Sequence, residues 1–295
     1  MLYSTTVGLF GRTTAAAPIH LGIGLLALLG LVGLVRRHAG RWAGWTAALI
    51  LLSSYNLGAL MGWAYVDLGT LLYGTLALIA VTAFGESKQT RWIVAMAIIA
   101  GLAAGVKYNA GALGLAMGAA VLLTDPRRAV QDGLVMAGVA ALVFAPWALK
   151  GLLLYGNPVY PFALGGLEWD AGRTAAFGFL ISASVGEVVV APADLPFAAT
   201  IFGQDNVDGY GFTLGAWLLT SFAALPLLWR WLTPRERTLA RTVGIFITVL
   251  WAFWIAAGWS SGVGIQTRLM IMAFPPLQRR AGWSSSGCGA SRKSR

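Results

Sequence analysis

The charged residues that could do chemistry in this chain lie at the ends of apolar segments rather than inside them. Asp67 comes shortly before one apolar segment, Lys107 lies between two others, and Arg268 directly precedes a fourth. A carboxylate can orient a hydroxyl group or accept its proton, whereas ammonium and guanidinium groups bind phosphate oxygens. The combination predicts a site in which cations hold an anionic, lipid-linked ligand beside a carboxylate.

Each of these residues also has a simpler structural interpretation. Asp67 could be the N-cap of a helix over residues 69–85, because aspartate accepts hydrogen bonds from the free amides of a first helical turn. Lys107 could be an interfacial lysine whose stem lies along apolar surface. Lys150, which follows Pro146 and Trp147, is better explained as an interfacial anchor. Capping and a chemical role are compatible for Asp67, so both interpretations stay open.

The composition identifies the environment in which these residues lie. The chain has 295 residues, of which 58% are hydrophobic and only 11% are charged. Soluble domains are about 45–50% apolar and about 25% charged, and the mean hydropathy here is +0.72. This composition predicts an integral membrane protein and excludes a soluble enzyme. It also excludes a nucleic-acid-binding domain, although the formal net charge is +10.

The apolar segments are long enough to cross a membrane repeatedly, since about 20 apolar residues in a helix span a bilayer core. We therefore expect an all-α fold, a polytopic transmembrane helical bundle with about eight complete spans and a truncated ninth at residues 269–277, where Pro275 and Pro276 interrupt it. Residues 1–19 are expected to lie at the outer interface, and residues 149–211 to form a long extracytoplasmic loop. The expected complete spans are 20–36, 42–60, 69–85, 92–106, 108–124, 130–148, 212–230 and 241–259.

The distribution of basic residues gives these spans a direction. Every second connection is rich in Lys and Arg, as the positive-inside rule predicts for cytoplasmic turns. This places Asp67, Lys107 and Arg268 on the outer face of a multi-pass protein of the cell (plasma) membrane. The cytoplasmic turns hold eleven basic residues: Arg36, Arg37, Arg41, Lys88, Arg91, Arg127, Arg128, Arg230, Arg235, Arg237 and Arg241. The outer connections hold four: Lys107, Lys150, Arg173 and Arg268.

Two further patterns concern helix packing and metals. The spans 92–106 and 108–124 carry the motifs Gly101-xxx-Gly105 and Gly114-xxx-Gly118, which favour close helix packing and are not a nucleotide-binding motif. Cys288 is the only cysteine, and the two histidines are too few for a histidine metal site. The acids of the outer loop have no convincing ligand spacing. No metal site or cofactor is predicted, although a divalent metal ion could still assist.

Several stretches together resemble a known family. They are 20–37, 64–68, 101–108, 145–147, 155–162 and 268–275, and the most specific is the run Gly156 to Phe162 after Pro146-Trp147. With these stretches in this order, the chain resembles integral-membrane glycosyltransferases of GT-C type. The resemblance covers about residues 1–277. More narrowly, it is similar to the family 39-like group, the bacterial relatives of protein O-mannosyltransferases and of the lipid A aminoarabinose transferase.

The resemblance implies an activity and a set of site residues. Such enzymes transfer a sugar from a polyprenyl-phosphate carrier to an acceptor on the extracytoplasmic face. Asp67 matches the second outward acid of the family and becomes the catalytic candidate. Lys107 and Arg268 match positions that resemble ligands of the carrier phosphate, and Lys150-Gly151 stands where the family often has Arg-Asn. The expected substrate-binding residues are Lys107, Tyr108, Asn157, Tyr160 and Arg268.

The implied mechanism is displacement at the anomeric carbon. The carboxylate would deprotonate or orient the acceptor hydroxyl, and the cations would stabilise the departing phosphate, where negative charge develops. The principal acid of the family lies in a first outward loop that would precede Met1. We therefore expect a fragment that is inactive or nearly so, and a non-native or disordered basic tail at residues 279–295.

Two other functions stay open at this point. A transporter or flippase of a lipid-linked substrate would also be polytopic, but transporters often show internal repeats and interrupted helices at the middle of the bilayer. Here the charged residues of the candidate site, Asp67, Lys107 and Arg268, lie at one face, and no charged residue lies in the middle of an expected span, which favours surface chemistry. A non-catalytic membrane protein is the third interpretation. The sequence indicates a membrane-lipid environment and no nucleic-acid partner, and it indicates neither the sugar, the acceptor nor the oligomeric state.

Overall fold

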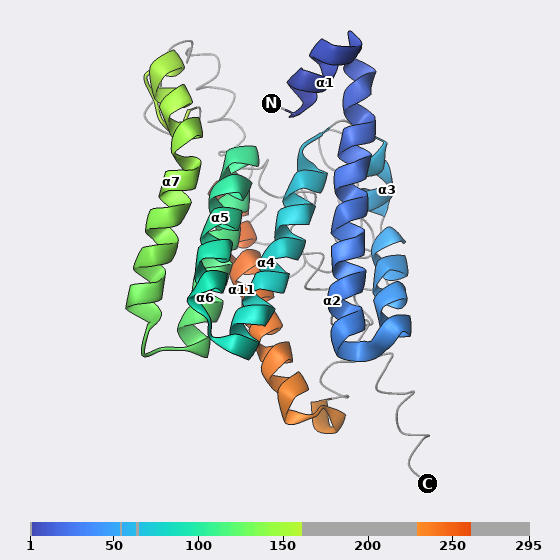
Figure 1. Cartoon of the computed structure of the whole chain (residues 1–295), viewed down its shortest axis with the longest axis vertical. Coiled ribbons are helices and arrows are strands. Elements are labelled where there is room, and N and C mark those ends of the chain that lie inside the picture. The colour runs from blue at the N-terminus through green and yellow to red at the C-terminus, as the bar shows by residue number, and fades with distance from the viewer. Residues whose placement is uncertain (1, 54, 63–64, 161–228, 261–295) are drawn as a thin grey trace.

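The computed structural model describes residues 2–53, 55–62, 65–160 and 229–260, and all regular elements of this part are helices. This confirms the expected all-α fold. The helices run side by side, with α7 at one edge, α2 and α3 at the other, and α4 and α5 between them (Figure 1). The α-helices are α1 (Leu2–Phe10), α2 (Ala16–Leu52), α3 (Tyr55–Met61), α4 (Asp67–Ser87), α5 (Thr90–Val106), α6 (Ala112–Thr124), α7 (Ala129–Tyr155) and α11 (Pro234–Ser260), with 3-10 turns at Thr13–Ala15, Tyr108–Gly111 and Trp229–Trp231.

Helix α2 is folded back on itself at Gly40. This residue has φ 88° and ψ 170°, a conformation that glycine adopts without steric cost. The two arms pack through Leu31, Val35 and Ala47, all of which are buried. A Cβ atom on Gly44 would lie 2.9 Å from the carbonyl oxygen of Val32, so glycine is also required where the arms approach each other. The turn predicted between the first two spans is thereby confirmed.

Two expected boundaries differ from the structure. The expected span 42–60 is interrupted, because α2 ends at Leu52 and α3 begins at Tyr55. The Ser53 hydroxyl donates to the carbonyl of Ile50 at 2.7 Å, a local bond by which serine competes with the helical backbone. Helix α7 continues to Tyr155, so residues 149–155, which we expected in the outer loop, are helical. The span 212–230 up to residue 228, the ninth span and the tail lie outside the described residues.

The described helices are those of a membrane protein. Three are long and apolar enough to cross a bilayer: Thr13–Leu52, Asp67–Ser87 and Ala129–Tyr155. Shorter apolar helices cover Thr90–Val106, Tyr108–Thr124 and Ala240–Phe253. The count of eight full-length spans is therefore not reproduced in the described part of the chain. Large apolar side chains on the outer surface, such as Leu142 at 73% and Leu153 at 74% exposure, suit contact with lipid.

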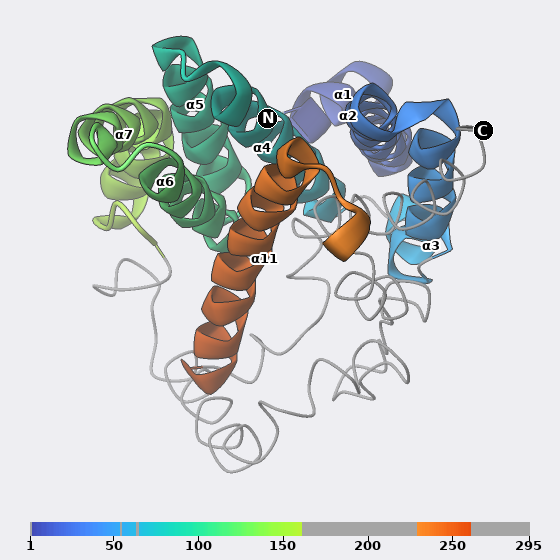
Figure 2. The same cartoon turned by 90° about the horizontal axis from the view of Figure 1, so that it is seen from below.

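Small residues allow helices α5 and α7 to pack closely. A Cβ atom on Gly101 would lie 2.6 Å from the carbonyl oxygen of Ala140, and one on Gly105 would lie 2.6 Å from the ring of Trp147. Real Cβ atoms do not tolerate such distances, so the first glycine pair of the sequence is required for helix packing, as predicted. Helix α11 packs against α6 and α4, and Figure 2 shows that it crosses both.

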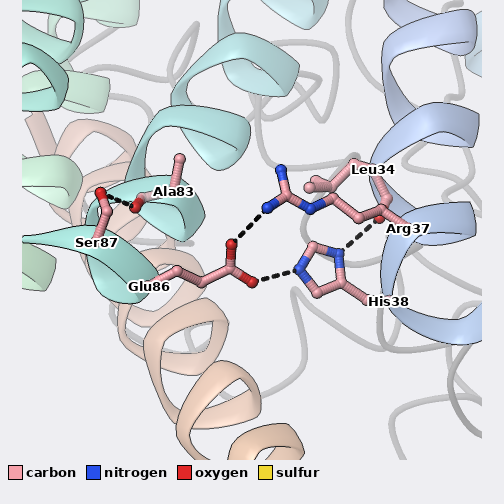
Figure 3. A network of polar contacts seen from close by, with 6 residues as sticks. All are labelled: Leu34, Arg37, His38, Ala83, Glu86 and Ser87. Carbon is pink, nitrogen blue, oxygen red and sulfur yellow. Dashed lines mark hydrogen bonds and ion pairs between the residues drawn. The ribbon is translucent and has the colours of Figure 1, made fainter.

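The end of the bundle where α4 stops, which we call the Glu86 end, is held by ion pairs. Glu86 accepts a bond from Arg37 Nη2 at 2.9 Å through one oxygen and lies 3.0 Å from His38 Nε2 through the other (Figure 3). The other ring nitrogen of His38 lies 2.8 Å from the carbonyl oxygen of Leu34. Nearby, Lys88 Nζ donates to the carbonyl of Thr124 at 2.9 Å, which ties α4 to α6. These contacts link the predicted basic turns to one another.

Candidate functional site

The opposite end of the bundle, which we call the Asp67 end, contains a buried ion pair. Lys107 Nζ lies 2.8 Å from Asp67 Oδ1, and the aspartate side chain is 1% exposed whereas the lysine side chain is 26% exposed. The carboxylate is therefore inside the protein, and the ammonium group reaches it from the surface. Oδ2 of Asp67 is buried without a hydrogen-bond partner among the described residues. A buried carboxylate oxygen in this state is costly unless something else binds it.

The local backbone explains how the two charges meet. Asp67 is the first residue of α4, and the N-cap position is occupied by Val66, with no side-chain capping bond. The interpretation of Asp67 as an N-cap is therefore wrong. Lys107 has an extended backbone, φ −157° and ψ 127°, at the break between α5 and the following 3-10 turn. This break was predicted from the sequence, and it is what turns the lysine toward α4.

Two residues that sequence reasoning did not single out lie against Asp67. His20 is fully buried, and its Nε2 accepts the backbone N–H of Leu68 at 3.1 Å. Tyr3 packs edge-on against the His20 ring at 6.1 Å between ring centroids. The Tyr3 hydroxyl also donates to the carbonyl of Tyr65 at 2.8 Å. Burial, together with the negative charge of Asp67, raises the pKa of Tyr3 to about 12.

A tight turn after α7 brings another part of the expected site to this end. Gly156 ends the helix with φ 69°, and its N–H donates to the carbonyl of Leu152 at 2.9 Å. Asn157 is fully buried, and its Oδ1 accepts the N–H of Val159 at 2.9 Å. The side chain of Asn157 thus shapes the turn itself, as asparagine commonly does.

The tyrosines of the expected site hold this turn against α5 and α7. The Tyr108 hydroxyl, one residue after Lys107, donates to the carbonyl of Tyr160 at 2.9 Å. The ring of Tyr160 stacks on that of Tyr155 at 4.3 Å, and Tyr108 meets Phe144 edge-on. In the described structure both tyrosines therefore serve to position the segment next to Lys107.

The position Lys150-Gly151 also has a structural explanation. A Cβ atom on Gly151 would lie 2.7 Å from the carbonyl oxygen of Asn157, so a larger residue cannot stand there while the turn keeps its form. Lys150 is exposed on α7, which is compatible with an interfacial anchor. This local packing explains why residue 151 is glycine, at a position where the family that the chain resembles often has asparagine.

Taken together, the structure brings Asp67 and Lys107 into direct contact and places Tyr108 beside Lys107, with Tyr160 bonded to Tyr108. Arg268 lies outside the described residues. His20 and Tyr3 were missed because a single histidine and a single tyrosine at these positions carry no spacing signal. No group of three or more His, Cys, Asp or Glu that could hold a metal ion occurs in the described ranges.

Comparison with known proteins decides the family. The family model of dolichyl-phosphate-mannose-protein mannosyltransferases matches residues 4–149. Over these residues the chain belongs to this GT-C type glycosyltransferase family. Its members are membrane glycosyltransferases that use a lipid-linked sugar donor. No curated protein and no solved structure matches the chain.

The family match covers some of the candidate site residues of this glycosyltransferase and not others. It includes Asp67, Lys107 and Tyr108, together with the newly found neighbour His20, whereas Tyr3 lies one residue before the matched region. Asn157, Tyr160 and Arg268 lie after the matched residues, so the family match does not bear on them. The region of the family match therefore contains both residues of the ion pair at the Asp67 end, and also His20.

Proposed function

We propose that this glycosyltransferase moves a sugar from a polyprenyl-phosphate-linked donor to an acceptor hydroxyl, with Asp67 as the catalytic carboxylate. The observation that supports the proposal is the state of Asp67. One of its oxygens is paired with Lys107, and the other is buried with no hydrogen-bond partner in the described part of the chain. An acceptor hydroxyl that donates to Oδ2 would satisfy this oxygen.

In this proposal the carboxylate orients the acceptor and takes its proton. The acceptor oxygen attacks the anomeric carbon of the donor, the bond from that carbon to the phosphate oxygen breaks, and the polyprenyl phosphate leaves with the bonding electron pair. The proton passes from the acceptor hydroxyl to Asp67 Oδ2. General-base assistance of this kind contributes about 10²–10⁴-fold in rate.

Lys107 has the role of holding both the acid and the donor. An ammonium group has three N–H donors, so Lys107 can keep its bond to Asp67 and donate to a phosphate oxygen as well. Its partial exposure of 26% supports access from outside the bundle. A cation at the bridging phosphate would stabilise the negative charge that develops as the carrier leaves. Arg268 is proposed as a second ligand of the same phosphate.

The proposed active face is extracytoplasmic. Arg37, Lys88 and other basic residues lie at the Glu86 end, and the positive-inside rule assigns a basic end to the cytoplasm. The Asp67 end would then face outward. Donors carried on a polyprenyl phosphate are available at that face without a nucleotide, which supports a transferase built from membrane helices.

The proposal is tested with the full chain purified into lipid nanodiscs. The nanodiscs are supplied with polyprenyl-phosphate mannose, glucose or aminoarabinose carrying a radiolabelled sugar, together with a membrane extract as the source of acceptors. The expected result is slow but measurable release of polyprenyl phosphate, coupled to a new labelled product, which is compatible with the low activity expected from the sequence. Asp67→Asn is expected to reduce this release at least 100-fold while polyprenyl phosphate binding stays within about threefold, since the carboxylate acts on the acceptor.

A matched control lies on the same helix. Glu86→Gln removes the ion-paired carboxylate at the other end of α4 and is expected to leave transfer unchanged. Equal loss of transfer in Asp67→Asn and Glu86→Gln would argue that both act only through stability. Transfer in Asp67→Asn at the wild-type rate would refute the assigned role of the carboxylate.

A further inference from the structure

We infer that His20 is a positioning residue for Asp67: it caps helix α4 from a different helix and so leaves the aspartate carboxylate available for Lys107 and for substrate. The inference rests on the proposed role of Asp67 in transfer. It starts from the amides at the beginning of α4, because the first N–H groups of a helix have no partner within the helix.

The structure gives the partners of three of the amides at the beginning of α4. The N–H groups of Gly69 and Thr70 both donate to the carbonyl of Val66, at 3.0 and 3.3 Å. The N–H of Leu68 donates to Nε2 of His20 at 3.1 Å. Val66 occupies the N-cap position, and valine has no side-chain acceptor. The bond that an N-cap side chain normally makes to the second or third amide is therefore supplied by His20 from α2.

This arrangement changes what Asp67 does. An aspartate at the start of a helix commonly turns back to accept the free amides of the first turn. Here the amide of Leu68 is already bonded, and the carboxylate points instead to Lys107 at 2.8 Å, while Oδ2 has no hydrogen-bond partner in the part of the chain that the structure describes. The imidazole can play this role only when Nε2 is the unprotonated nitrogen. The contact of Tyr3 with the His20 ring helps to fix the ring in place.

The test measures whether His20 controls the pairing of Asp67 with Lys107. Melting temperatures are determined in detergent for Asp67→Asn, Lys107→Met and the double variant, and their departure from additivity reports the coupling of the pair. The same set is made in His20→Gln, which keeps an acceptor, and in His20→Phe, which keeps a ring against Tyr3 without one. Coupling is expected to persist with Gln and to disappear with Phe.

Activity supplies a second readout. His20→Phe is expected to lower kcat for sugar transfer at least tenfold with little change in the KM for donor, and His20→Gln to restore most of the loss. Unchanged coupling in His20→Phe would overturn the inference, because His20 would then only fill space. Absence of transfer in the wild-type chain would count against the proposed function, while the coupling measurement would still decide the role of His20.

A measurement on the native chain covers the case in which His20→Phe does not fold. The chain has only two histidines, so the ring nitrogens of His20 can be assigned in a ¹⁵N-histidine spectrum by comparison with His20→Gln. An unprotonated Nε2 and a protonated Nδ1 are expected. A proton on Nε2 would contradict the inference, since that nitrogen could not accept the N–H of Leu68.

Discussion

Lys107 Nζ lies 2.8 Å from Asp67 Oδ1, although forty residues separate the two along the chain. The aspartate begins α4 and the lysine follows α5, so the pair exists only because the two helices pack side by side with opposite directions. The carboxylate is buried and the ammonium group is partly exposed. Removing the charge of Lys107 and removing the charge of Asp67 are therefore expected to change the stability of the protein by different amounts.

We expect Lys107→Met to destabilise the protein more than Asp67→Asn. Loss of the lysine leaves a buried carboxylate without its counter-charge, and removing one member of a buried ion pair costs about 3–5 kcal/mol. Loss of the charge on Asp67 leaves an ammonium group that can turn to solvent. Thermal unfolding in detergent measures both, and Asp67→Asn/Lys107→Met should recover part of the loss. A lysine variant as stable as the wild type would contradict the burial of this pair.

Gly101→Ala is expected to destabilise the contact between α5 and α7. The added Cβ would lie 2.6 Å from the carbonyl oxygen of Ala140, so the helices must separate, at a cost of about 1–3 kcal/mol. Gly138→Ala, on α7 with nothing within 4 Å of an added Cβ, is the matched control and should be neutral or stabilising. Melting temperatures of the two variants measure this difference. A stabilising effect of Gly101→Ala would show that α5 and α7 pack less closely than in the structure.

At the Glu86 end, Glu86→Gln is expected to cost more stability than Arg37→Gln. The Arg37 side chain is 66% exposed, and exposed ion pairs contribute about 0–1 kcal/mol. Glu86 also lies against His38, whose side chain is only 7% exposed and would be left with a weaker partner. Unfolding at low and at 0.5 M salt separates the effects, since only the contribution of the exposed pair should fade with salt. Equal losses in both variants would disprove the unequal roles.

The titration of Tyr3 should report the charge of Asp67. The pKa of Tyr3 is raised to about 12 in the folded chain, so its neutral form is favoured. The stability that this provides is fully present below about pH 10, the ordinary phenol value, and is lost as the pH rises through about 12.

Tyrosine labelled with ¹³C at Cζ allows this titration to be followed, with Tyr3→Phe identifying the signal. Asp67→Asn should move the midpoint only part of the way toward 10, because burial is the larger cause of the shift. A midpoint that stays at its original value in Asp67→Asn would show that the carboxylate does not influence this tyrosine.

Much of the fold follows from composition and local pattern. The low charge content and the apolar segments predict membrane helices, and the turns near Gly40, Lys88, Lys107 and Asp125 lie where the structure has them. The boundaries at Leu52 and Tyr155 were missed because helix ends depend on single hydrogen bonds, which hydropathy does not record.

The sequence by itself determined that the chain is an all-α membrane protein, where most of its turns lie, and that Asp67 and Lys107 are ionisable residues at the ends of apolar helices. Only the tertiary structure decided that these two form a pair, that Asp67 does not cap its helix, and that His20 bonds the amide of Leu68. The physical reason is that helix periodicity is a local property of the chain, whereas burial, ion pairing and capping from another helix depend on which helices lie side by side.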